Sequence, residues 1–320
     1  MRHFARLARV GETHAKALQP SRVAPVFDGD QGLQSVMSRF ETGPGALLGY
    51  GSEAVVLGLD DKRVLRVLRE GADPAVLRAR QGLVDELAAR GAPFLLPELE
   101  EVGEFDGRWY GIERRLPGRP VTEVLPTLIG HERDLLVERY MDATAALGDL
   151  YLAPRAYWGE LIGDHPLRAE TWPAYLRSRA TQSLRRSGLP LRGDGPADLA
   201  LELAAGLPNP DDAAFVHLDA FGGNVLMVGT SVTAVIDIGV TGVAGDRRLD
   251  PLSALVYLSA PEITPEATSR DAQVAMSWLR SAGLDQWLLP VRDWLAAYWS
   301  FAVSDRKLHE WCQAVLGGRG

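Results

Sequence analysis

The order of two hydrophobic patterns constrains this 320-residue chain more than any other feature of its sequence. Up to about residue 116, short aliphatic and β-branched runs alternate with Gly and Asp, which predicts strands and turns. Beyond that point, apolar residues recur at spacings of three and four, which is the pattern of amphipathic helices. Only residues 214–239 return to strand-like runs. The sequence therefore predicts an α+β protein whose strands come first.

The strand-rich part is predicted to contain five strands and one helix. A three-stranded meander is expected over residues 45–69, which read GALLGYG, SEAVVLGL and RVLRVL around turn residues. A helix is predicted over 74–90, because the segment begins with proline and is followed by Gly91. Two more strands are expected on either side of the turn FDGR, from LPELEEVGEF and GRWYGIERRL.

The second part is predicted to be helical, with one β-hairpin inside it. Residues 132–152 place Leu136, Tyr140 and Leu147 on one face of a long helix. Similar patterns occur at 171–184, 196–207, 251–260, 271–283 and 291–316. We therefore divide the chain into a basic N-terminal extension, a β-rich lobe and a helical lobe, over 1–30, 31–115 and 116–320. This order is typical of the two-lobed, protein-kinase-like fold.

Composition narrows the partners that we expect. Asp and Glu number 42 against 34 Lys and Arg, which gives a formal net charge of −8 and argues against a nucleic-acid partner. A single cysteine, Cys312, excludes an internal disulfide and a Cys-based zinc cluster, so we expect a cytoplasmic location. No apolar run approaches the roughly 18 residues that cross a bilayer, so we expect no membrane span.

The strongest chemical signal is the motif H-x-D-x-x-x-x-N, whose acid is Asp219 and whose amide is Asn224, followed later by Asp237. Each residue alone has a commoner structural explanation, as a turn former, a left-handed residue or a strand cap. Phosphoryl transfer, however, needs a carboxylate for the attacking hydroxyl and two oxygen ligands for Mg²⁺. Strands over 225–228 and 232–236 can pair as a hairpin and bring the amide beside the later acid. The three side chains can therefore meet all three needs.

The segment FVHLDAFGGNVLMVGTSVTAVIDIGVTGVAGDRRLDPLSAL resembles the catalytic core of the aminoglycoside phosphotransferase family, with a spacing most like that of hygromycin phosphotransferases. The resemblance spans residues 33 to about 260 and includes a hinge-like segment, IERRLPGRP, at 112–120. It implies an ATP- and Mg²⁺-dependent enzyme of antibiotic resistance. The implied roles are catalytic base for Asp219, magnesium ligands for Asn224 and Asp237, and loop support for His217, Asp246 and Asp250.

On the nucleotide side, a glycine-rich turn at 49–55 lies between two predicted strands. Small residues there let backbone N–H groups approach phosphates, although an ordinary hairpin turn is the alternative. The candidate phosphate-covering residues are Gly49, Gly51, Ser52 and Glu53. The resemblance further implies that hinge backbone near Glu113 and Arg115 holds the adenine.

Two departures from the family pattern affect the nucleotide side. The third strand should present a lysine to the phosphates, but Arg66 stands there, with Lys62 as a second choice. Arginine keeps the positive charge and has a different hydrogen-bond geometry. The helix should carry a partner acid at about Gln81, yet it offers only Asp85 and Glu86. The sequence therefore departs from the family pattern at both positions of the ion pair.

These features predict a kinase that transfers the γ-phosphate of ATP to a hydroxyl of a cationic or polyhydroxylated small molecule, with a hygromycin-type aminoglycoside as the first choice. The substrate candidates are Glu160, Asp164 and Trp158, the last in an expected loop. The alternatives are a kinase of a macrolide, nucleoside or amino alcohol, and a non-catalytic nucleotide-binding module. A hydrolase is disfavoured because the sequence lacks a G-x-S-x-G nucleophile motif. We expect a monomer or a homodimer.

Overall fold

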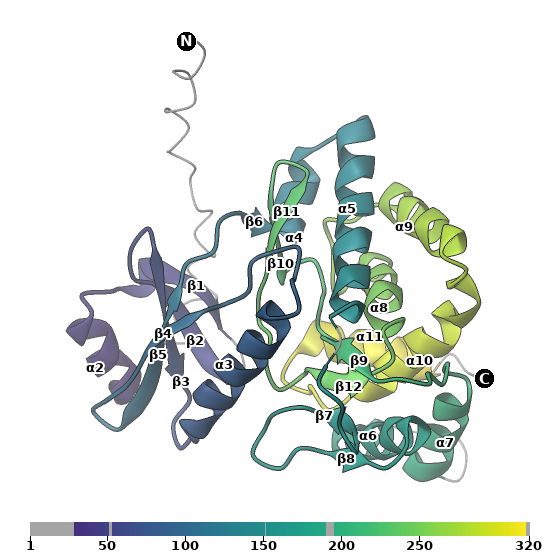
Figure 1. Ribbon diagram of the computed structural model, residues 1–320, viewed down its shortest axis with the longest axis horizontal. Coiled ribbons are helices and arrows are strands. Elements are labelled where there is room, and N and C mark those ends of the chain that lie inside the picture. The colour runs from purple at the N-terminus through teal and green to yellow at the C-terminus, as the bar shows by residue number, and fades with distance from the viewer. Residues whose placement is uncertain (1–28, 51–52, 151, 190–194, 318–320) are drawn as a thin grey trace. The chain divides into compact units, whose positions relative to one another are not determined.

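The computed structural model describes residues 29–50, 53–150, 152–189 and 195–317, which form two compact units (Figure 1). The first unit takes the described part of Met1–Pro74 and adds Leu99–Arg115. The second unit takes Ala75–Glu98 and the rest of the chain from Leu116. The helix after Pro74 thus groups with the second unit, whereas the sequence analysis places it with the strands. Most of the basic extension lies outside the described residues.

The first unit contains a five-stranded antiparallel sheet in the order β1-β2-β3-β5-β4 (Figure 1). The turn between the last two strands is made by Asp106 and Gly107, whose φ angles are 51° and 73°. Such left-handed residues are typical of tight two-residue hairpins. The predicted meander and the predicted strand pair are confirmed. The bounds are β1 Leu47–Tyr50, β2 Ala54–Gly58, β3 Arg63–Leu68, β4 Leu99–Phe105 and β5 Arg108–Arg114.

A helix that the sequence analysis did not predict, α2 (Gln31–Arg39), covers one face of this sheet. Its side chains Leu33, Val36 and Met37 are buried against alternate residues of the strands. Asp30 begins the helix, since its carboxylate accepts a hydrogen bond of 2.9 Å from the N–H of Leu33. The first unit therefore has a small core of its own between one helix and the sheet.

The second unit is mainly helical (Figure 1). Its helix α5 (Gly130–Gly148) buries Leu136, Tyr140 and Leu147, so the predicted apolar stripe is confirmed. The predicted stretch 291–316 is divided between two helices. None of the described helices is long and apolar enough to cross a membrane. The other bounds are α3 Ala75–Ala88, α4 Val121–Val124, α6 Trp172–Ser187, α7 Pro196–Ala205, α8 Leu249–Leu258, α9 Ser269–Ser281, α10 Leu288–Trp299 and α11 Arg306–Gly317.

The second unit also has more strands than the one hairpin that we predicted. The hairpin β10–β11 is extended by β6, and four further strands form a sheet in the order β8-β7-β12-β9. These extra strands are only two or three residues long. They are too short to show an alternating pattern, so the prediction missed most of them. The bounds are β6 Arg119–Pro120, β7 Trp158–Glu160, β8 Arg168–Ala169, β9 Ala214–Val216, β10 Val225–Val228, β11 Ser231–Val235 and β12 Val243–Gly245.

One hydrophobic core runs through the second unit and fixes both ends of the segment 217–224. Phe215 and Val216 of β9 are buried at one end, and Val225 of β10 is buried at the other. Helix α3 joins the same core through Leu83, Val84 and other apolar residues. The segment that carries the predicted catalytic motif is therefore anchored in packed structure on both sides.

Candidate active site

Asp250, in the first turn of α8, holds the start of the loop that carries Asp219. Its Oδ2 accepts a hydrogen bond of 2.8 Å from the N–H of His217, and its Oδ1 accepts one of 2.9 Å from the N–H of Leu218. Burial raises the pKa of Asp250 to about 6, against the opposite effects of His217 and of the two N–H groups. The carboxylate thus fixes two successive peptide groups just before Asp219.

The ring of His217 connects this loop to the end of the β10–β11 hairpin. Its Nε2 lies 3.0 Å from the carbonyl oxygen of Ile236, and its Nδ1 lies 3.3 Å from the N–H of Asp219. A carbonyl can only accept and a backbone N–H can only donate. Nε2 therefore carries the hydrogen and Nδ1 is the acceptor, which defines one neutral tautomer.

Two buried tyrosines hold the peptide groups on either side of Asp219. The hydroxyl of Tyr257 donates to the carbonyl of Leu218 at 2.7 Å, and the hydroxyl of Tyr140 donates to the carbonyl of Ala220 at 2.9 Å. Burial raises the pKa of both hydroxyls well above the ordinary value, so both remain protonated donors. The sequence analysis missed this role, because Tyr140 appeared only as one apolar position of a helix.

A tryptophan extends this arrangement on one side. The indole Nε1 of Trp299 donates to the hydroxyl of Tyr257 at 2.9 Å, so that hydroxyl both accepts and donates. The held residue, Leu218, has a φ of 61°, a left-handed conformation that is unfavourable for leucine. The surrounding hydrogen bonds therefore stabilise a backbone shape that the loop would not adopt alone.

The hairpin places Asn224 beside Asp237, as the spacing predicts. Val225 pairs with Val235 in the β10–β11 register, and the N–H of Ile236 donates to the carbonyl of Asn224 at 2.9 Å. The side chain of Asn224 contacts the other acid, since its Nδ2 donates to the backbone oxygen of Asp219 at 2.8 Å and to its Oδ2 at 3.2 Å. Asn224 thus binds Asp219 through its side chain and the residue before Asp237 through its backbone.

The donor set at this place fits a hard divalent cation. The Oδ1 of Asn224 receives no hydrogen bond from the described residues, so this amide oxygen is left to bind a cation. Asp237 is exposed, and Asp219 is partly exposed. Carboxylate and amide oxygens are ligands that Mg²⁺ takes. Among the described residues, no group of three His, Cys, Asp or Glu side chains could hold a metal ion. A site here with three protein ligands would therefore need the amide of Asn224.

Asp246, the second acid implied as a loop partner, has a different contact. It is fully buried and binds the guanidinium of Arg248 at 2.7 Å, and that guanidinium lies 4.7 Å from the centre of the Trp287 ring. Asp250 therefore binds the loop directly, while Asp246 fixes the turn that leads into α8.

In the first unit, Arg66 is paired with Glu113. The Nε of Arg66 on β3 donates to Glu113 Oε1 on β5 at 2.8 Å, and the side chains are only 13% and 7% exposed. Arg66 stands opposite Gly111, so Glu113 lies diagonally across on the same face. The sequence analysis gave Glu113 only a backbone role, because the pairing of β3 with β5 was not known.

Lys62 does not lie in the third strand, where we placed it as the alternative cation. It lies in the exposed turn before β3, and its carbonyl accepts a hydrogen bond of 2.6 Å from the N–H of Arg115. The Nη1 of Arg115 also binds the carbonyl of Asp60 in that turn, at 2.9 Å. Arg115 thus secures the turn, and of the two predicted candidates, Arg66 and Lys62, only Arg66 lies within the strand.

The glycine-rich turn lies only partly within the described residues. Gly49 is in β1, and the carbonyl of Glu53 accepts a hydrogen bond of 2.9 Å from the N–H of Arg69 beyond the end of β3. Gly51 and Ser52, the two other predicted residues of the turn, lie outside the described residues. Their predicted contact with phosphates therefore stays a prediction.

The acids of helix α3 have partners within the second unit. Glu86 binds Arg155 at 2.6 Å and accepts a hydrogen bond of 2.7 Å from the N–H of Ala153. Its hydrogen bond with Arg155 is the main reason that the pKa of Glu86 is lowered. Asp85 accepts a hydrogen bond from Gln81 of the same helix. Glu86 thus fixes the chain after α5 to α3.

The three substrate candidates have different surroundings. Glu160 accepts a hydrogen bond of 2.7 Å from the N–H of Leu167 and lies 3.6 Å from the guanidinium of Arg179. Trp158 lies in strand β7 rather than in the predicted loop, and the centre of its ring lies 5.9 Å from the centre of the Trp172 ring. Asp164 is exposed in the next turn.

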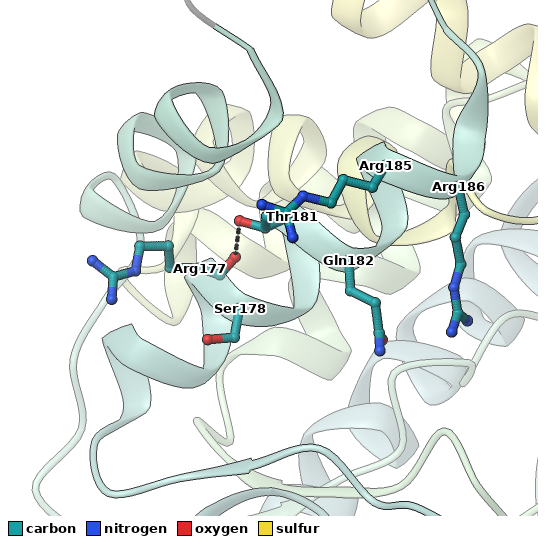
Figure 2. A pocket seen from close by; sticks show the side chains of 6 residues that line it. All are labelled: Arg177, Ser178, Thr181, Gln182, Arg185 and Arg186. Carbon is teal, nitrogen blue, oxygen red and sulfur yellow. Dashed lines mark hydrogen bonds between the residues drawn. The ribbon is translucent and has the colours of Figure 1, made fainter.

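A surface hollow on α6 contains none of the predicted site residues (Figure 2). Figure 2 shows the guanidinium group of Arg177 at the left of the view and that of Arg186 at the right, so the two do not converge on one ligand. The hollow is lined by Arg177, Ser178, Thr181, Gln182, Arg185 and Arg186. The site of interest is therefore the loop around Asp219.

The chain has the features of a phosphotransferase with a kinase-like fold: a β-rich first unit, a helical second unit and the loop around Asp219. Residues 46–280 match a family model described as the phosphotransferase enzyme family, APH. The match covers well over half of the chain, so the chain belongs to this family of small-molecule kinases. The resemblance to the family is confirmed, but nothing in the match favours hygromycin enzymes.

Solved structures of aminoglycoside phosphotransferases have the same fold at low sequence identity. The GDP complex of wild-type aminoglycoside 2′-phosphotransferase-IIIa has a TM-score of 0.58 and 12% identity, covering 90% of this chain and 98% of that chain. The gentamicin–APH(2″)-IIa complex has a TM-score of 0.56 and 13% identity, covering 86% and 91%. The predicted α+β, kinase-like fold is confirmed. Comparison with curated proteins finds no match.

Proposed function

We propose that this phosphotransferase moves the γ-phosphoryl group of ATP to a hydroxyl of a small molecule, with Asp219 as the base and with Asn224 and Asp237 as Mg²⁺ ligands. The position of Asn224 carries the proposal. Its side chain binds Asp219, while its backbone pairs with the residue before Asp237. One amide thereby links a carboxylate that can receive a proton to a carboxylate that can bind a metal.

In the proposed reaction, Asp219 accepts a hydrogen bond from the acceptor hydroxyl and takes its proton as the new P–O bond forms. The bond between the γ-phosphorus and its bridging oxygen breaks, and the nucleoside diphosphate leaves. A bound Mg²⁺ would neutralise charge on the phosphates. Asp250, Tyr140 and Tyr257 hold the loop so that the carboxylate is oriented before the acceptor arrives.

On the nucleotide side, we propose that Arg66 neutralises phosphate charge and that the turn from Gly49 to Glu53 covers the phosphates. The pairing with Glu113 supports the first role, because it fixes the guanidinium in one orientation. The hinge roles of Glu113 and Arg115 involve backbone groups, which any side chain permits. GTP is a second candidate donor, since one related solved structure is bound to ADP and another is a complex with GDP.

For the acceptor, we propose an aminoglycoside, with hygromycin tested first. The acidic composition supports a cationic acceptor, and one related solved structure is a complex with gentamicin. A neutral acceptor, such as a macrolide, nucleoside or amino alcohol, is a second candidate. The pairing of Glu160 with Arg179 favours it, because that carboxylate is already neutralised. We also expect a cytoplasmic location and a monomer or homodimer.

A panel of acceptors tests this proposal. The full chain is incubated with Mg²⁺, with ATP or GTP, and with hygromycin, gentamicin, a macrolide, a nucleoside or an amino alcohol. Mass spectrometry of the acceptor should show a product heavier by one phosphoryl group with the wild type and not with Asp219→Asn. Nucleotide binding without any product across a broad panel would contradict the proposal and favour the non-catalytic module.

A further inference from the structure

Helix α3 places a buried arginine next to the predicted metal-binding acid. Arg80 is 8% exposed, and its Nε donates to the carbonyl of Ile238 at 2.6 Å. Ile238 directly follows Asp237 and is fully buried. The helix and this segment both belong to the second unit. Arg80 is therefore fixed to the backbone one residue beyond the acid.

Asp237 has a backbone conformation that its neighbours must maintain. Its φ of 59° lies in the left-handed region, which costs free energy for a residue other than glycine. The peptide groups before it are held through Ile236, whose N–H binds Asn224 and whose carbonyl binds the His217 ring. Arg80 provides the corresponding contact on the far side. The acid is thus held from both directions along the chain.

A buried guanidinium is a costly choice for this position. Desolvating a charge is unfavourable unless hydrogen bonds compensate it, and even buried ion pairs can often be replaced by well-packed apolar residues without loss of stability. The other core-facing residues of α3 are apolar and include Leu77, Leu83, Val84 and Leu87. A role in packing alone would be served by a residue of the same kind.

We propose that Arg80 is a positioning residue for magnesium: by holding the Ile238 carbonyl, it keeps the Asp237 carboxylate oriented toward the cation. The inference rests on the proposed function, because it requires Asp237 to be a metal ligand. Outer-shell partners of metal ligands typically change metal affinity by about 10- to 100-fold when they are removed. The expected effect is therefore on magnesium dependence rather than on folding alone.

The test measures the Mg²⁺ concentration that gives half of the thermal stabilisation by AMPPNP, a non-hydrolysable ATP analogue. Arg80→Met removes the donor at similar length and should raise this concentration about tenfold or more. Arg80→Lys keeps a charged donor and should raise it less than Arg80→Met does. Arg78→Met, on an exposed position of the same helix, is the matched control and should leave it unchanged.

An unchanged magnesium midpoint in Arg80→Met, even with a lower melting temperature, would overturn the inference and leave Arg80 a structural role. Asp237→Ala separates this result from a failure of the proposed function. If Asp237→Ala responds to Mg²⁺ as the wild type does, the proposed metal site itself is wrong. If Arg80→Met does not fold, Arg80→Lys is compared with the shorter Arg80→Gln. Equal midpoints for those two variants would also overturn the inference.

Discussion

The two units of this phosphotransferase secure their functional residues in different ways. In the second unit, the loop around Asp219 is held by buried hydrogen bonds from Asp250 and Tyr257 of α8 and from Tyr140 of α5. In the first unit, Arg66 is held by an ion pair with Glu113 on a neighbouring strand of the sheet. We therefore expect the loop around Asp219 to tolerate loss of a single support, and the orientation of Arg66 to change when Glu113 is removed.

The largest effect is expected from Asp219→Asn, because no support of the loop can replace the carboxylate that we propose as the proton acceptor. Removing a general base typically lowers the rate by about 10²- to 10⁴-fold, so kcat should fall by that order. Nucleotide affinity should change little. Steady-state kinetics and a nucleotide titration check both expectations, with the exposed Asp285→Asn as the control. A fall in kcat of less than tenfold would contradict the role of Asp219.

The next effect tests the dependence of Arg66 on its pairing with Glu113. Glu113→Ala leaves the guanidinium of Arg66 buried without that carboxylate, and breaking a buried pair typically costs about 3–5 kcal/mol. We expect a loss of this order in the free energy of unfolding, measured with urea, and a higher KM for ATP. The double variant Glu113→Ala, Arg66→Met should recover part of the loss. Glu104→Ala, on an exposed position of β4, is the control, and an equal loss there would contradict the account.

A smaller effect is expected from Tyr257→Phe in the second unit. The change leaves the buried Leu218 carbonyl and the Trp299 indole N–H without their partner, which costs about 1–3 kcal/mol of stability. Because Asp250 and Tyr140 still hold the loop, kcat should fall less than about tenfold. Chemical unfolding and kinetics measure the two quantities. A loss of kcat as large as that of Asp219→Asn would show that the loop depends on this one support.

The smallest effect concerns pH and the raised pKa of Asp250. Below about pH 6 the folded protein protonates Asp250, so the carboxylate that holds two loop N–H groups loses its charge and activity should decline. Stability should change in the opposite direction. Because the pKa of Asp250 is higher in the folded protein than in the unfolded chain, protonation of Asp250 stabilises the fold. This stabilisation is fully present below the unfolded pKa, near 3.8, and is lost as the pH rises through about 6.

Asp250→Asn is the variant that isolates this titration. The free energy of unfolding of the wild type should fall relative to that of the variant as the pH rises from 4 to 6. A difference that does not vary over this interval would show that Asp250 does not titrate there. In the variant, the decline of kcat near pH 6 on the acid side of the pH profile should also be absent.

The sequence contained the information for the fold and for the central motif, because both depend on local patterns. The alternation in 45–69 and the stripe of α5 are properties of neighbouring residues, and the spacing from Asn224 to Asp237 is that of a short hairpin. The family resemblance then added roles that spacing alone does not give. The chemistry of these residues stays a prediction until it is measured.

The supports of the site could not be predicted in the same way, because they come from residues that are distant along the chain. The hydroxyl of Tyr140 binds a carbonyl 80 residues away along the chain, and that of Tyr257 binds one 39 residues away. Arg80 binds a carbonyl 158 residues further on. Each of these residues lies in an ordinary helical pattern, so the sequence indicates burial but not the partner. Only the packing of the second unit identifies them.

The most direct measurement of the central claim is the position of a bound metal. A crystal of the protein with Mn²⁺ and AMPPNP would show the ion by its anomalous scattering. We expect a peak at about 2.1 Å from Asn224 Oδ1 and from a carboxylate oxygen of Asp237. A nucleotide bound with its metal elsewhere, and with those two side chains turned away from it, would contradict the account.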